Sequence, residues 1–214
     1  DELWQPVDIP HDWMIYDTQY FFESCEGWYR KRFDIGRTSL NERTKEFDRT
    51  GYKLRFEGIY MDSTIWLNGS LVGEWKYGYS TFEIDITDAL KPGENELLVR
   101  VVLQIPNSRW YSGAGIYRNV WLKAVPELHF ASDGIYISTV KKEACWTVRV
   151  QSEIECIDRE NEFDLSNACI IRHTIIDSDG KMLAANEGAA TTLELKVIDP
   201  DLWRLDNPAL YTLK

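Results

Sequence analysis

The chain is organised around the stretch Asn107-Ser-Arg-Trp-Tyr-Ser-Gly-Ala-Gly-Ile-Tyr-Arg-Asn-Val-Trp-Leu122. Its first half is polar and aromatic and contains Gly113 and Gly115, which predicts a loop. Its second half alternates with a period of two, which predicts a β-strand that begins near Ile116. A loop rich in Arg, Trp and Tyr that is held by a strand is typical of a binding surface.

The composition is that of a globular protein with one large or two small domains. The 214 residues are 44% hydrophobic and 28% charged, and the net charge is −11. This acidity argues against a nucleic-acid partner, which calls for a basic face. No apolar run approaches the roughly 18 residues of a membrane span, so we expect no membrane partner. The nine Trp and eleven Tyr either pack the core or, in loops, offer flat faces on which sugars stack.

No catalytic or cofactor-binding pattern stands out. Gly113-Ala-Gly115 lacks the following helix that a phosphate loop needs, so we expect no nucleotide. Three histidines are too few and too scattered for a metal site, and we expect no cofactor. His11, beside Asp12, belongs either to a binding cluster or to a structural turn. The four cysteines show no C-x-x-C spacing and are interpreted as reduced thiols, with one disulfide as the alternative: Cys25, Cys145, Cys156 and Cys169.

Short predicted strands separated by Gly, Pro and Asn turns fill residues 1–125. Asn68-Gly69 supplies the positive φ angles of a tight hairpin turn between two of them. Residues 36–51 are charged and turn-like. The pattern predicts an all-β sandwich or jelly roll, with strands at 27–35, 53–56, 63–67, 70–73, 81–86 and 96–103.

Residues 126–214 form a second predicted β region after a hinge at Val125-Pro126. Six or so strands in about 88 residues fit an immunoglobulin-like sandwich. We expect Trp203, in a loop with two prolines, to be inserted into its core. Strands are predicted at 135–140, 146–156, 170–176 and 181–185, with a further strand from Leu210.

Several motifs together resemble the amino-terminal part of family 2 glycoside hydrolases, the β-galactosidases, β-glucuronidases and β-mannosidases. The opening stretch is most similar to bacterial β-galactosidases. The other motifs are Pro10-His-Asp-Trp13, Gly27-Trp-Tyr-Arg-Lys31, Phe56-Glu-Gly-Ile-Tyr-Met-Asp62, Trp66-Leu-Asn-Gly69, Tyr77-Gly-Tyr-Ser80, Leu90-Lys-Pro-Gly-Glu-Asn95 and Leu202-Trp-Arg-Leu-Asp-Asn-Pro-Ala-Leu-Tyr211.

The resemblance implies a galactose-binding-like jelly-roll domain at 1–125 and an immunoglobulin-like domain at 126–214. In such enzymes a TIM barrel follows and holds the two glutamates of retaining hydrolysis. The resemblance therefore implies a chain with no catalytic residue of its own, partnered by that barrel, by a β-linked sugar and, in the full enzyme, by further copies of itself. The family normally has a strand before the Pro10 motif, and its second domain normally has a closing strand after Leu213. A sandwich without that closing strand exposes an edge, so we expect either that the second domain is truncated or that a neighbour fills the edge.

The expected function is therefore to support a β-galactosidase active site. The candidates for loops that face the sugar or the barrel are Asp12, Asn107, Arg109, Trp110 and Tyr111. Charged side chains grip hydroxyls and rings stack on apolar sugar faces, although Arg109 and Trp110 could equally fix the barrel interface. The alternatives are a stand-alone carbohydrate-binding module and a purely structural pair of β modules.

Overall fold

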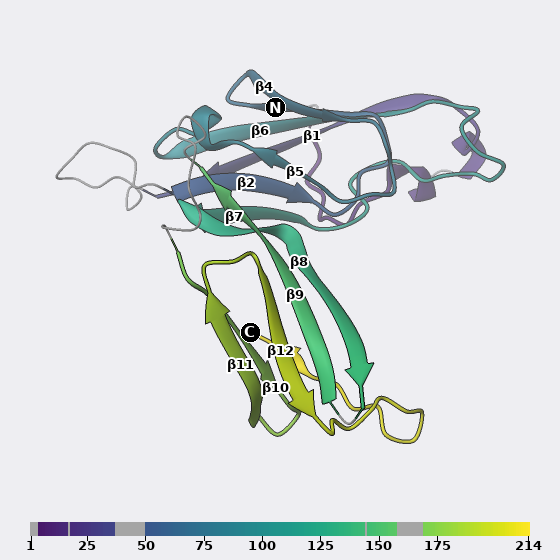
Figure 1. Cartoon of the computed structure of the whole chain (residues 1–214). Helices are drawn as coiled ribbons and strands as arrows, with labels where there is room; N and C mark the ends of the chain where they lie inside the picture. Colours follow the sequence, from purple (N-terminus) through teal and green to yellow (C-terminus); the bar gives the residue numbers. More distant parts are fainter. Residues whose placement is uncertain (1–3, 17, 37–49, 144, 158–168) are drawn as a thin grey trace. The chain divides into compact units, whose positions relative to one another are not determined.

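The computed structural model describes all residues except 1–3, 17, 37–49, 144 and 158–168. Of the turn-like stretch expected at 36–51, residues 37–49 therefore lie outside the described part. The chain divides into two compact units, Asp1–Pro126 and Glu127–Lys214. Strands dominate both units in Figure 1, and the described helices are short 3₁₀ turns, none long enough to cross a membrane. The all-β prediction is confirmed.

The first unit is a sandwich of two antiparallel sheets. One sheet has the order β1-β6-β3-β4 and the other the order β5-β2-β7. The strands alternate buried and exposed residues, most clearly in β6, because each sheet has one face against the core. The elements are η1 Trp13–Tyr16, η2 Thr18–Tyr20, β1 Cys25–Asp34, β2 Thr50–Phe56, β3 Ser63–Leu67, β4 Ser70–Trp75, β5 Phe82–Asp85, η4 Thr87–Ala89, β6 Glu94–Leu103 and β7 Val120–Pro126.

The core of this unit lies between its two sheets. Phe56 from one sheet and Ile65 and Val101 from the other are fully buried. The predicted hairpin is present, with φ of 53° at Asn68 and 83° at Gly69. A buried network of amide hydrogen bonds lies next to this hairpin and fixes the turn that leads into β6. In it the Asn95 side chain is hydrogen-bonded to the Asn68 side chain and to the backbone of Lys91 and Gly93.

The predicted start of the strand after the opening loop is wrong. The strand β7 begins at Val120 rather than near Ile116, and Arg118 is exposed whereas Ile116 is buried. The backbone before Val120 is instead hydrogen-bonded to the part of the chain that precedes β1, which we call the lead-in segment. The N–H of His11 donates to the carbonyl of Ile116 at 2.7 Å, and the N–H of Trp13 donates to that of Ala114 at 3.1 Å. Distant residues thus override the local alternation.

The second unit consists of two three-stranded sheets, β12-β9-β8 and β11-β10-β13. Val150, Ile175 and Leu195 come from both sheets and form its core. Trp203 is 58% exposed, so the expectation that it is inserted into the core is wrong. All four cysteines are free, as expected. The strands are β8 Leu128–Lys142, β9 Cys145–Cys156, β10 Ile171–Ile176, β11 Met182–Gly188, β12 Thr192–Ile198 and β13 Thr212–Leu213.

Candidate functional site

The loop between β6 and β7 presents two aromatic side chains to solvent. Trp110 is 62% exposed and Tyr111 is 58% exposed. The Ser108 hydroxyl donates to the carbonyl of Trp110 at 2.6 Å and tightens the turn. The Tyr111 ring stacks on the Phe21 ring, with the ring centroids 4.7 Å apart and an angle of 6° between the ring planes, so the loop packs against the lead-in segment. The Tyr111 ring is therefore held in place rather than free.

Asp12 ties the lead-in segment to the same loop. Its Oδ1 atom accepts hydrogen bonds from the backbone N–H groups of Met14 at 3.0 Å and Ala114 at 2.9 Å. A Cβ on Gly113 would collide with this carboxylate, so only glycine allows the close approach. Within the described residues no hydrogen bond reaches Oδ2. One oxygen of Asp12 is thus structural, and the other packs against Gly113.

Three tyrosines from other segments lie beside the loop and Asp12, and together these side chains form one wall. The rings of Tyr60 and Tyr79 meet edge to face, with centroids 5.1 Å apart, and the Tyr117 hydroxyl donates to the carbonyl of Gly78 at 2.6 Å. Burial raises the pKa of Tyr79, as does its hydrogen bond with Tyr60, while a hydrogen bond with the Trp110 side chain opposes the rise. Burial also raises the pKa of Tyr117, against the nearby Arg118 charge. Tyr79 and Tyr117 therefore stay neutral and serve as hydrogen-bonding groups.

Together these side chains enclose a pocket of about 240 Å³. Three of the five predicted site residues line it: Asp12, Trp110 and Tyr111. Asn107 is not part of the lining and accepts a hydrogen bond from the Ser112 hydroxyl at 3.3 Å. Arg109 is exposed and also lies outside the lining. The pocket is lined by Asp12, Tyr60, Tyr79, Trp110, Tyr111, Ser112, Gly113, Ala114 and Tyr117.

The sequence analysis missed the tyrosine part of this wall. Tyr60 and Tyr79 lie in two of the motifs that carry the family resemblance, and that was the available signal. Nothing in the local sequence indicates that these two residues meet the loop before β7, because the contacts span the whole first unit.

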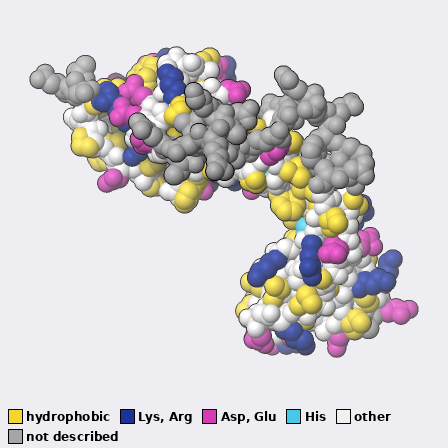
Figure 2. Space-filling model, turned by 90° about the vertical axis from the view of Figure 1, so that its left-hand side faces the viewer, with side chains coloured by type: hydrophobic (Ala, Val, Ile, Leu, Met, Phe, Trp, Pro, Cys, Tyr) yellow, Lys and Arg dark blue, Asp and Glu magenta, His cyan; other side chains and the backbone are white. Residues whose placement is uncertain are grey.

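The chemistry of the pocket suits a neutral polyhydroxylated ring. Asp12 is the one acidic side chain of its lining, the tyrosines offer hydroxyl groups, and the aromatic faces can stack on the C–H face of a sugar. Among the described residues no group of three His, Cys, Asp or Glu side chains could hold a metal ion. Acidic and basic side chains are mixed on the face shown in Figure 2.

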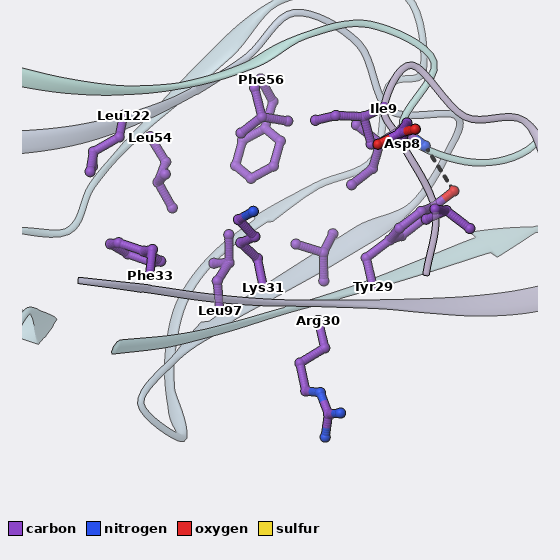
Figure 3. Close-up of a pocket in the computed structure, with 14 residues that line it drawn as sticks. Asp8, Ile9, Tyr29, Arg30, Lys31, Phe33, Leu54, Phe56, Leu97 and Leu122 are labelled. Carbon is purple, nitrogen blue, oxygen red and sulfur yellow. Dashed lines mark hydrogen bonds between the residues drawn. The ribbon is translucent and has the colours of Figure 1, made fainter. Parts of the chain in front are cut away.

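A larger cavity of about 430 Å³ lies between the two sheets of the first unit. Figure 3 shows Tyr29, Lys31 and Phe33 of β1 on the cavity side, whereas Arg30 points away from it. The Tyr29 hydroxyl accepts a hydrogen bond from the N–H of Ile116 at 3.3 Å, and burial raises its pKa to about 12. The lining is mostly core side chains, so this cavity belongs to the packing of the sandwich.

Comparisons with known proteins all find similarity to one family of proteins. The family described as "Glycosyl hydrolases family 2, sugar binding domain" matches residues 6–126. The chain is 33% identical to the β-galactosidase BoGH2A of Bacteroides ovatus, over 100% of the chain and 26% of that protein. It is 30% identical to a putative β-glucuronidase of Formosa agariphila, over 100% of the chain and 21% of that protein.

A solved structure agrees. A glycosyl hydrolase family 2 member from Bacteroides cellulosilyticus superposes with a TM-score of 0.79 at 33% identity, covering 100% of this chain and 30% of that one. The chain therefore spans between a fifth and a third of the length of these relatives.

Proposed function

Since the chain belongs to glycosyl hydrolase family 2, we propose that it is the non-catalytic amino-terminal region of a retaining exo-β-glycosidase of the β-galactosidase kind. In this role the first unit helps to shape the pocket that a catalytic TIM barrel presents to a terminal β-linked sugar. The second unit acts as an immunoglobulin-like spacer domain.

The observation that carries this proposal is the exposed, pre-arranged wall formed by Asp12, Trp110 and Tyr111. It lies in the part of the chain that matches the family's sugar-binding domain. A sugar or a neighbouring domain would cover these exposed aromatic rings and could contact the carboxylate beside them.

Turnover by the chain itself tests the proposal. We expect no release of nitrophenolate when the pure chain is incubated with 4-nitrophenyl β-galactoside, because two carboxylates that flank a glycosidic bond are needed for retaining hydrolysis. Release at a rate proportional to chain concentration would overturn the non-catalytic assignment.

A second candidate is a stand-alone carbohydrate-binding module. The feature that favours this candidate is that every residue of the pocket lining comes from the first unit. Calorimetry with galactose and short galactans separates the two candidates. Measurable heat of binding supports the stand-alone module, whereas its absence supports a wall that acts only beside the barrel.

A further inference from the structure

The turn Asn68-Gly69 between β3 and β4 has the sequence at which an asparagine side chain deamidates most readily. In this reaction the backbone nitrogen of the following residue attacks the side-chain carbon Cγ, and a glycine at that place hinders the attack least. A Cβ built on Gly69 would lie more than 4 Å from every described atom outside its chain neighbours, so the turn has open space on that side. The local sequence and the local space therefore both permit the reaction.

The closed hairpin opposes it, because the Asn68 amide is part of a hydrogen-bond network. Its Nδ2 atom donates to the carbonyl of Ala89 and to Oδ1 of Asn95, both at 2.8 Å. Its Oδ1 atom accepts the N–H of Glu96 at 3.1 Å. Since deamidation expels Nδ2 as ammonia, it removes both donations beside the buried Asn95. The side chain must therefore leave the network before it reacts.

Neither product of the reaction fits the place that the amide leaves. An aspartate at position 68 has no amide hydrogen, and its carboxylate would face the carbonyl oxygen of Ala89 and the Oδ1 atom of Asn95. An isoaspartate would lengthen the main chain inside the short turn between the paired residues Leu67 and Ser70, and the length of such a turn sets the register of its strands. A hairpin that has reacted therefore cannot close as before.

We propose that Asn68 is a site of spontaneous deamidation, protected by the closed hairpin and exposed by its local opening. The Gly69 nitrogen loses its proton to water and forms a bond to Cγ of Asn68, the bond from Cγ to Nδ2 breaks, and ammonia leaves. Water then opens the cyclic imide to aspartate or isoaspartate. Because the ammonia is lost to solution, each chain that reacts leaves the native population permanently. The site does not depend on the sugar-binding role of the first unit.

Peptide mass spectrometry of the chain after incubation at mildly alkaline pH measures the rate at Asn68. The folded chain should react roughly a hundredfold or more slowly than the same chain in denaturing urea, because only the open hairpin reacts. Asn95→Ala removes one acceptor of the amide and should raise the folded rate roughly tenfold or more. The matched control is Val125→Ala, which leaves a cavity at a buried residue of the other sheet and should change the rate by less than about twofold.

Asn68→Asp reproduces one product without any incubation and tests the second half of the proposal. Its Tm should fall by about 3 °C or more, whereas Asn119→Asp, the same change at an exposed asparagine of the same unit, should leave the Tm within about 1 °C. Equal rates at Asn68 in the folded and the urea-unfolded chain would overturn the protection. Equal acceleration by Asn95→Ala and Val125→Ala would overturn local opening as the route, and a wild-type Tm of Asn68→Asp would show that the product fits.

Discussion

The Oδ1 atom of Asp12 lies 2.9 Å from the backbone nitrogen of Ala114, although 102 residues separate the two in the chain. The same oxygen also accepts the N–H of Met14. One carboxylate oxygen therefore joins the lead-in segment to the loop that carries the exposed Trp110 and Tyr111, and the shape of the candidate site depends on it.

Asp12→Ala should destabilise the first unit by about 1–3 kcal/mol, because it leaves two backbone donors without their acceptor. Asp12→Asn keeps an acceptor oxygen and should recover a large part of the loss. Urea unfolding followed by far-UV circular dichroism measures both. Asp8→Ala, at an exposed carboxylate nearby, is the matched control and should change stability by less than about 0.5 kcal/mol. Equal effects at both positions would contradict the role of Asp12.

Gly113→Ala should destabilise the chain by about 1–3 kcal/mol, since the new methyl group would meet the Asp12 carboxylate. The clash is specific to that pair. In an Asp12→Ala background the same substitution should cost much less, and the difference is the coupling energy of a double-mutant cycle. Additive effects of the two substitutions would show that the loop adapts to the methyl group.

The tight hairpin at Asn68-Gly69 and the alternation of β6 could be predicted from sequence because both are local patterns. The start of β7 could not, because the backbone near Ile116 bonds to His11 and Tyr29, which are far away in the chain. Trp203 was expected in a core by its hydrophobicity, yet its loop leaves it 58% exposed.

Part of the candidate site could be predicted from local sequence, and the part formed by distant segments could not. Loop composition pointed to Trp110 and Tyr111, and a short motif pointed to Asp12. The tyrosines opposite them, Tyr60 and Tyr79, enter only through the folding of the sandwich, which brings distant segments to one pocket.

Asn95→Ala should cost about 2–4 kcal/mol, because Asn95 is 1% exposed and its side chain makes four hydrogen bonds to Asn68, Lys91 and Gly93. Asn95→Asp is nearly isosteric but turns an oxygen toward the carbonyls of Lys91 and Gly93, so it should be at least as damaging at neutral pH. Thermal unfolding of the two variants checks this order. A mild effect of Asn95→Asp would mean that the network rearranges.

The second unit should lose stability as the pH falls below 6.5, the ordinary pKa of histidine. Burial lowers the pKa of His173, against a hydrogen bond with the Lys214 backbone, and its Nε2 atom lies 2.9 Å from the Ser152 hydroxyl. The unfolded chain then binds a proton more tightly than the folded one. The stabilisation is therefore complete above pH 6.5 and is lost by at most about 1.4 kcal/mol per pH unit as the pH falls through the lowered pKa.

Amide hydrogen exchange in β9 and β10 at pH values from 7.5 to 5, corrected for intrinsic rates, measures that dependence. His173→Gln keeps a polar side chain without the titration and should flatten the profile relative to the wild type. A variant with an unchanged slope would assign the pH dependence to another group.

The proposed role of the wall formed by Asp12, Trp110 and Tyr111 is to complete a glycosidase pocket. Its most direct test is the kcat/KM for 4-nitrophenyl β-galactoside of a polypeptide in which this chain is joined to a family 2 catalytic barrel. Trp110→Ala should lower kcat/KM by roughly tenfold or more, since a stacked ring contributes about 1.5 kcal/mol. Trp121→Ala, at a Trp that is 52% exposed on β7, should leave it within about twofold. Unchanged kinetics of Trp110→Ala, with the Tm preserved, would contradict the claim.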